Sequence, residues 1–192
     1  MANKNEFQPD KKKLGIWDRL HLTRKQRKNL LRWVLHSLAL LILSLIQDVI
    51  LCRYEILGAT TDLVPCAIIL ICLLEGLESS CIFALCASCL YFLSGTAPGV
   101  YAMVILTFLA ILAVWLRQAK LREGFANAML CTVPTVLVYE LLIYVFGLFL
   151  GHTYPARIVG FLITAGLTCL TAPILYPLFL KIASIGGDPW KE

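Results

Sequence analysis

Long apolar runs divide the chain into six segments, which polar or turn-forming residues separate. The runs cover residues 30–51, 63–77, 80–97, 98–116, 126–150 and 157–180. A helix rises about 1.5 Å per residue, so about 20 apolar residues cross the roughly 30 Å hydrocarbon core of a bilayer. The pattern predicts an all-α fold, a polytopic membrane helix bundle of about six transmembrane helices.

The second and third segments are the exceptions in length. A helix over residues 62–78 would rise only about 24 Å, which is less than the thickness of the core. The two segments therefore form either two short spans or a re-entrant pair between four full spans. Both arrangements return the chain to the same side of the membrane. Glu75, Gly76 and Glu78 lie between the two segments and predict a turn with solvated carboxylates.

The basic residues predict how the helices are oriented. The N-terminal part through Arg32 carries ten Lys and Arg, the 117–125 loop three and the C-terminus two, while Arg53 and Arg157 fall on the other side. Because Lys and Arg are enriched in cytoplasmic loops, both termini are predicted to be cytoplasmic. The chain then consists of a basic tail (1–29), a transmembrane domain (30–182) and a short cytoplasmic C-terminal tail (183–192).

The N-terminal tail predicts two further features. Thr23 followed by Gln26 has the spacing of a capping box, so the first helix should begin before its apolar run does. Apolar residues around Trp17 alternate with Lys and Arg, which suits a short amphipathic segment lying on the anionic lipids of the inner leaflet. The alternative is a disordered segment that only fixes the orientation of the chain.

Composition excludes several classes of function. The 192 residues are 59% hydrophobic and only 15% charged, with a net charge of +5. A soluble domain would have about a quarter of its residues charged. The chain is therefore neither a soluble enzyme nor a nucleic-acid-binding domain, and its expected location is the cell membrane.

No motif for catalysis or metal binding stands out. The three histidines are scattered, and no zinc-protease helix, nucleophile elbow or phosphate-binding loop is present. Cys86 and Cys89 form a C-x-x-C within a predicted helix, where the two further ligands of a zinc site are missing. Buried cysteines usually act as small hydrophobic residues. We expect a protein that is not an enzyme and needs no cofactor.

Two acidic residues at membrane depth are candidates for function, because a charge costs roughly 2.5–3.5 kcal/mol at the bilayer centre. Asp48 lies near the outer end of the first helix, where we expect contact with water. Glu140 lies in the outer half of the fifth helix. It either contacts a partner subunit or lipid headgroup, or pairs internally with Arg53 or Arg157. The internal pair is the favoured reading.

Small residues recur at helical spacing in the last two segments. Gly147 and Gly151 form a GxxxG pattern. On the sixth segment small residues recur every fourth position, at Ala156, Gly160, Thr164, Thr168 and Ala172. Such residues let helix backbones approach closely in lipid. The stripes predict close packing, either within the bundle, which is favoured, or against a partner.

The middle of the chain resembles the MreD family, the bacterial rod shape-determining membrane proteins. The resemblance rests on short motifs at residues 57–63, 73–76, 94–102 and 174–178, whose marker residues are Asp62, Gly76, Gly95 and Gly99. The family has a proline before the first aspartate, where this chain has Thr61. It has another aspartate before the Ser-Gly turn, which falls here on Tyr91 or Phe92.

The resemblance implies a non-enzymatic subunit of the cell-elongation machinery. Such a subunit would contact MreC, the RodA glycosyltransferase with its penicillin-binding transpeptidase and, indirectly, MreB filaments. It would support rod shape and side-wall peptidoglycan synthesis as a membrane scaffold.

The alternative is the membrane substrate-binding subunit of an energy-coupling-factor type vitamin transporter. These subunits have a similar length and also six helices. A subunit of this kind would need an outer pocket of polar groups, for which the sequence offers Asp48, Arg53, Glu140 and His152.

Overall fold

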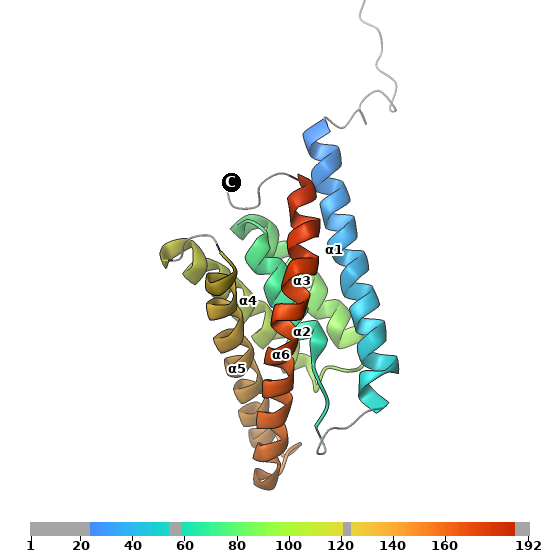
Figure 1. The fold of residues 1–192 in the computed structure, drawn as a ribbon. Coiled ribbons are helices and arrows are strands. Elements are labelled where there is room, and N and C mark those ends of the chain that lie inside the picture. The colour runs from blue at the N-terminus through green and yellow to red at the C-terminus, as the bar shows by residue number, and fades with distance from the viewer. Residues whose placement is uncertain (1–23, 54–58, 121–123, 187–192) are drawn as a thin grey trace, which may run out of the picture.

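The computed structural model describes residues 24–53, 59–120 and 124–186, and this part of the chain is all-helical without a strand. Its helices are α1 (Arg24–Val49), α2 (Leu63–Leu74), α3 (Leu77–Leu93), α4 (Val100–Lys120), α5 (Phe125–Phe149) and α6 (Ile158–Ala183) (Figure 1). Short 3-10 turns are η2 (Leu51–Arg53), η3 (Pro155–Arg157) and η4 (Ser184–Gly186). The predicted all-α fold is confirmed, and each helix lies within a few residues of its predicted bounds. The described part of α1 starts at Arg24, before its apolar run, as predicted, while Thr23 of the capping box lies outside the described residues.

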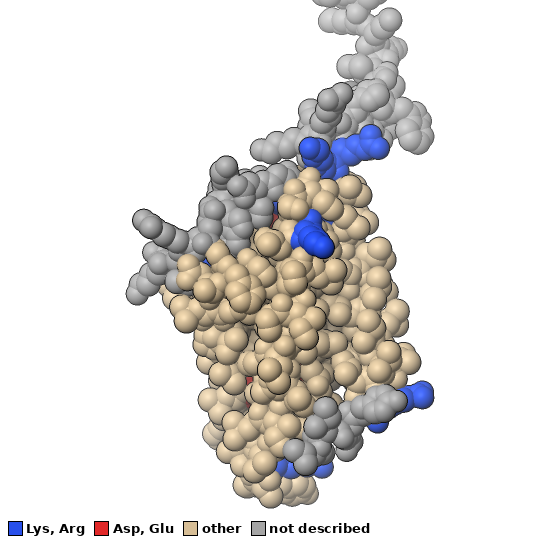
Figure 2. Space-filling model, in the orientation of Figure 1, with Lys and Arg blue, Asp and Glu red and all other residues tan. Residues whose placement is uncertain are grey.

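Four of the six helices, α1, α4, α5 and α6, are long and apolar enough to cross a membrane. Successive helices run in opposite directions, so that α1 begins and α6 ends at the same end of the bundle (Figure 1). We call this the basic end and the opposite one the far end. Figure 2 shows basic side chains near the two ends and other residues along the length between them.

Large apolar side chains cover the outside of the bundle. On α1, Leu38, Leu41 and Leu45 keep half or more of their surface exposed. Water would make such an extended apolar surface unfavourable, whereas lipid tails cover it without cost. The outer surface therefore fits a bilayer as its solvent.

The short helix α2 forms the centre of the bundle. All twelve of its residues are buried, and it packs against α1, α3, α4, α5 and α6. Its length of about 18 Å is too short for a bilayer, but the helices around it cover it on all sides. A two-residue turn joins it to α3, so the two segments of doubtful length form an antiparallel pair of shorter helices.

Candidate functional site

A glutamine of α1 holds the start of α2. Gln47 is buried, its Nε2 donates to Asp62 Oδ1 at 3.0 Å, and its Oε1 accepts the backbone N–H of Val64 at 2.9 Å. The first N–H groups of a helix have no partner within it, and Pro65 in the same turn has no N–H. Gln47 thus supplies an acceptor that the buried start of α2 requires.

The segment before α2 is also attached to α6. The backbone N–H of Asp62 donates to Thr168 Oγ1 at 3.1 Å, and Thr168 is fully buried. Asp62 is therefore positioned from two sides, by α1 through its side chain and by α6 through its backbone. The resemblance had marked Asp62, whereas Gln47 was missed because a single amide barely alters the hydropathy of an apolar run.

A polar cavity of about 690 Å³ opens beside Asp62 at the far end. Its charged lining residues are Asp62, Glu140 and Arg157, and Thr60, Thr96 and Thr164 contribute hydroxyl groups. These residues come from the segment before α2, the α3–α4 turn, α5, η3 and α6. The cavity is the part of the described structure where side chains of opposite charge face a shared space large enough for a small polar group.

Glu140 is the most buried charged residue of this cavity. It is 3% exposed, and its Oε1 has no hydrogen-bond partner in the structure. The predicted internal pair is wrong, because no ion pair joins Glu140 to Arg53 or to Arg157. Arg157 lines the same cavity but is itself exposed. A buried acceptor without a partner costs about 1–3 kcal/mol, so Glu140 is a group that a ligand would satisfy.

Two buried tyrosines lie next to the carboxylates. Tyr91 on α3 and Tyr139 on α5 are both about 1% exposed, and their hydroxyls lie close to each other and to Asp62 and Glu140. In the resemblance to the MreD family, the family's aspartate would fall on Tyr91 or on Phe92. Tyr91 therefore places a neutral hydroxyl beside Asp62 and Glu140, where a third carboxylate would be repelled by the two already present.

The small residues along η3 and α6 have two different roles. Ala156, Gly160 and Thr164 line the far-end cavity, and a side chain at Gly160 would meet nothing within 4 Å. Thr168 and Ala172 further along are buried where α6 packs against α2. The first part of the stripe therefore does not pack closely within the bundle, because its small side chains leave room for the cavity, and the alternative of a contact with a partner stays a prediction.

The GxxxG pattern ends a helix. Gly151 follows α5 with a φ of +71°, and its N–H donates to the Leu148 carbonyl at 3.1 Å. The N–H of His152 donates to the Gly147 carbonyl at 2.9 Å. These two bonds form a Schellman motif, which favours glycine at the left-handed position. The expectation that both glycines pack a helix is corrected: Gly151 lies in the turn, and a side chain at Gly147 would lie 2.7 Å from Thr153 Oγ1.

The three remaining marker glycines all lie in turns. Gly76 joins α2 to α3 with extended backbone. Gly95 follows α3 with a φ of +80°, a conformation that favours glycine. A side chain at Gly99 would lie 2.6 Å from the Tyr101 ring. The predicted tight turn between the third and fourth segments is therefore present.

The other proposed pocket residues lie outside the cavity. Asp48 is half-buried, and its Oδ1 is covered without a hydrogen-bond partner, so the carboxylate is less exposed than expected. Arg53 and His152 are exposed. Of the four residues named for a transporter pocket, only Glu140 is among those that line the far-end cavity.

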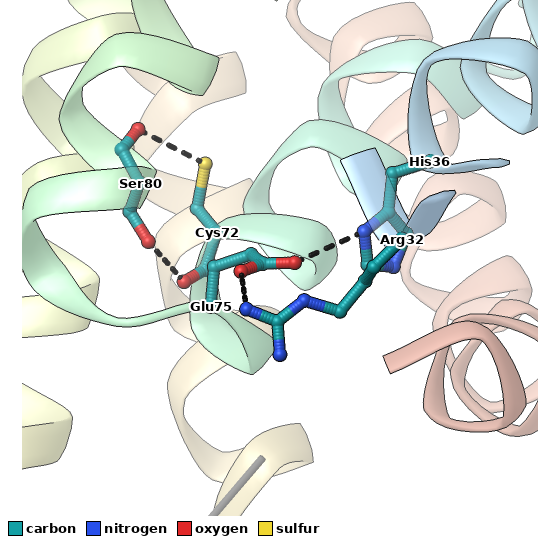
Figure 3. Close-up of polar contacts among 5 residues, drawn as sticks. All are labelled: Arg32, His36, Cys72, Glu75 and Ser80. Atoms are coloured by element: carbon teal, nitrogen blue, oxygen red, sulfur yellow. Dashed lines mark hydrogen bonds and ion pairs between the residues drawn. The ribbon is translucent and has the colours of Figure 1, made fainter. Parts of the chain in front are cut away.

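A second buried polar cluster lies at the basic end (Figure 3). Arg32 donates from a guanidinium nitrogen to Glu75 Oε2 at 2.8 Å, and His36 Nδ1 lies 3.1 Å from Glu75 Oε1. All three residues are at most 5% exposed. The expectation that Glu75 is solvated is wrong, although Glu78 is exposed as predicted. Arg32, counted with the basic tail, is likewise buried.

The position of Glu75 explains why it needs a cation. Glu75 caps the C-terminal end of α2, where the helix dipole disfavours negative charge. The Arg32 guanidinium compensates for this charge. Ser80 of α3 donates to the Cys72 carbonyl at 2.6 Å and so satisfies one of the last carbonyls of α2 (Figure 3). Arg32 and His36 are four apart on α1, a spacing that places them on one face and that could have signalled the cluster.

The remaining predictions on chemistry add no site. Within the described ranges, no three His, Cys, Asp or Glu residues are placed to hold a metal ion. Cys86 and Cys89 lie within α3 as free thiols, Cys86 exposed on the outside of the helix. The amphipathic segment around Trp17 lies outside the residues that the structure describes.

Comparisons with protein-family models, with curated proteins and with solved structures gave no match to this chain.

Proposed function

We propose that this protein is a non-enzymatic scaffold subunit of the bacterial elongation machinery in the cytoplasmic membrane. Both of its termini would lie in the cytoplasm, with the far end facing outward. It would contact MreC and the pair formed by RodA and its transpeptidase, and through them MreB, in support of rod shape and side-wall peptidoglycan synthesis. The resemblance to MreD at Asp62, Gly76, Gly95 and Gly99 motivates this proposal.

The feature that supports a scaffold best is a groove between α1 and α3. It measures about 630 Å³, and Val64 and Tyr91 lie among its lining residues. Leu38, Leu41 and Leu90 line it as well and are more than half exposed, so the groove opens on the apolar outside of the bundle.

Two small polar residues shape this groove. Ser37 and Ser44 are two helical turns apart on α1, and both line the groove. Small residues of this kind allow a partner helix to approach closely in lipid, and serine can also donate a hydrogen bond across the interface. We therefore assign the groove to the transmembrane helix of an MreC-type partner.

Filling the groove tests the assignment. Ser37→Trp and Ser44→Trp should each reduce co-purification of MreC with the full-length chain by about tenfold, because the larger ring occupies the space of the partner helix. Leu170→Trp is the matched control, since Leu170 is 67% exposed on α6 and lies outside the groove. Depletion of the protein should also round the cells.

Two results would contradict the scaffold proposal. One is that both groove variants and the control co-purify as much MreC as the wild type does. The other is normal rod shape after clean deletion in an organism with no second copy.

The far-end cavity favours one second candidate, a substrate-binding subunit of an energy-coupling-factor type transporter. Asp62, Glu140 and Arg157 give this cavity the convergent polar groups that a substrate pocket needs. Co-purification separates the two candidates: energy-coupling ATPases among the captured proteins would support the transporter, and MreC the scaffold. Neighbouring genes provide a second criterion: genes for energy-coupling ATPases next to the gene of this protein would support the transporter, and a gene for MreC the scaffold.

A further inference from the structure

Two cavities of opposite character meet at Glu140. The polar far-end cavity and an apolar groove of about 240 Å³ share Glu140 and Phe161 as lining residues. The groove lies between α5 and α6, and its other lining residues include Leu137, Leu141 and Leu162. The polar far-end cavity and the apolar groove therefore adjoin at these two side chains.

The groove faces the surface that lipid tails cover. Leu141 is 57% exposed and Leu162 is 63% exposed, while Ala165 at the same groove is buried and leaves space between the helices. An acyl chain lying there would contact apolar side chains on both sides. This arrangement suits a molecule whose polar head and hydrocarbon tail are joined, rather than a purely polar solute.

The charges that line the far-end cavity determine which lipid headgroup would fit. Glu140 Oε1 is buried without a partner, and Asp62 places a second carboxylate in the same cavity. Both accept hydrogen bonds and favour a cation that can donate several, such as a primary ammonium group. Arg157 is exposed where it lines the far-end cavity, and its guanidinium can bind a phosphate.

We propose that this site binds a phospholipid with a primary ammonium headgroup, of the phosphatidylethanolamine class. Its ammonium would donate to Glu140 and Asp62, its phosphate would pair with Arg157, and an acyl chain would lie in the groove between α5 and α6. The proposal goes beyond the scaffold function and does not depend on it.

The test compares two lipids that differ only in the head. Full-length protein in detergent is mixed with equal amounts of phosphatidylethanolamine and phosphatidylcholine of the same acyl chains, and bound lipid is measured by native mass spectrometry. The quaternary ammonium of phosphatidylcholine cannot donate a hydrogen bond, so the wild type should prefer phosphatidylethanolamine by about tenfold. Glu140→Gln should abolish the preference, and Glu78→Gln, at an exposed carboxylate of the other end, should keep it.

Two further variants keep the test decisive if Glu140→Gln does not fold. Arg157→Gln changes an exposed side chain and should weaken binding of phosphatidylethanolamine severalfold. Leu141→Trp fills the groove between α5 and α6, so it should weaken binding of phosphatidylethanolamine but leave binding of free glycerophosphoethanolamine unchanged. Equal binding of both lipids to the wild type would overturn the proposal. So would tight binding of the free headgroup with no effect of Leu141→Trp, since the ligand would then be a soluble zwitterion.

Discussion

Gln47 accepts the backbone N–H of Val64 at 2.9 Å, and this contact has a counterpart at the other end of α2, where His36 Nδ1 lies 3.1 Å from Glu75 Oε1. The sequence separation is the same on both helices, from 36 to 47 on α1 and from 64 to 75 on α2. It corresponds to about three helical turns, which brings each pair back to one face. The antiparallel helices are therefore matched in length and joined by polar contacts at both ends.

Removing the far-end contact should destabilise the fold. Gln47→Leu leaves the buried N–H of Val64 without its acceptor, which costs about 1–3 kcal/mol. Thermal unfolding of the full chain in detergent should show a lower Tm for this variant than for Gln118→Leu, an exposed glutamine of α4. Equal Tm values for the two variants would mean that Gln47 does not support α2.

Breaking the ion pair between Arg32 and Glu75 at the basic end should lower the free energy of unfolding more than Gln47→Leu does. Glu75→Gln leaves the Arg32 guanidinium buried without its counter-charge, and the loss of one member of a buried pair typically costs about 3–5 kcal/mol. Denaturant unfolding should detect this loss, and Glu78→Gln provides the control at a nearby exposed carboxylate. Arg32→Met combined with Glu75→Gln should recover part of the stability. A double variant no more stable than Glu75→Gln would contradict the explanation by an unpaired charge.

Replacing the glycine after α5 by alanine should lower the stability of the protein, whereas replacing a glycine within α6 should raise it. Gly151→Ala places a side chain at a φ of +71° and should destabilise the protein by about 1 kcal/mol. Gly166→Ala has open space around it within α6, so its higher helix propensity should raise stability by up to about 1 kcal/mol. Thermal unfolding of both variants measures the difference. A neutral Gly151→Ala would argue against the Schellman motif.

Thiol labelling tests the orientation of the bundle. Cys52 is exposed in η2 at the far end, so a membrane-impermeant maleimide should label it in intact cells. Ser184 is exposed at the basic end, and Ser184→Cys in a Cys52→Ser background should react only after the membrane is permeabilised. The reverse pattern would place both termini outside the cytoplasm and remove the basis for contact with MreB.

The apolar runs predicted the helices well because each long run must bury its backbone polar groups in hydrogen bonds of its own helix. They could not show which side chains inside a run face the protein. Arg32 was counted with the solvated tail and Glu75 with a solvated turn, although the two lie against each other. Their pairing depends on how α1 packs against α2, which hydropathy averaged over a run does not contain.

The far-end cavity was predicted only in part. Glu140 was noted because a carboxylate at membrane depth is costly, and Asp62 was noted only as a marker residue of the resemblance. The small residues of η3 and α6 were interpreted as a packing surface, since spacing alone cannot distinguish a helix contact from an empty space. Ala156, Gly160 and Thr164 line that space instead.

The burial of α2 has a consequence for how the protein is made. Synthesis from the N-terminus delivers α2 before α4, α5 and α6, three of the helices that later enclose it. Arg32, His36 and Gln47 precede α2 in the chain, so the contacts from α1 to its two ends are available as soon as it emerges from the ribosome. The first two helices can thus enter the membrane as one unit, with the charge of Glu75 already compensated.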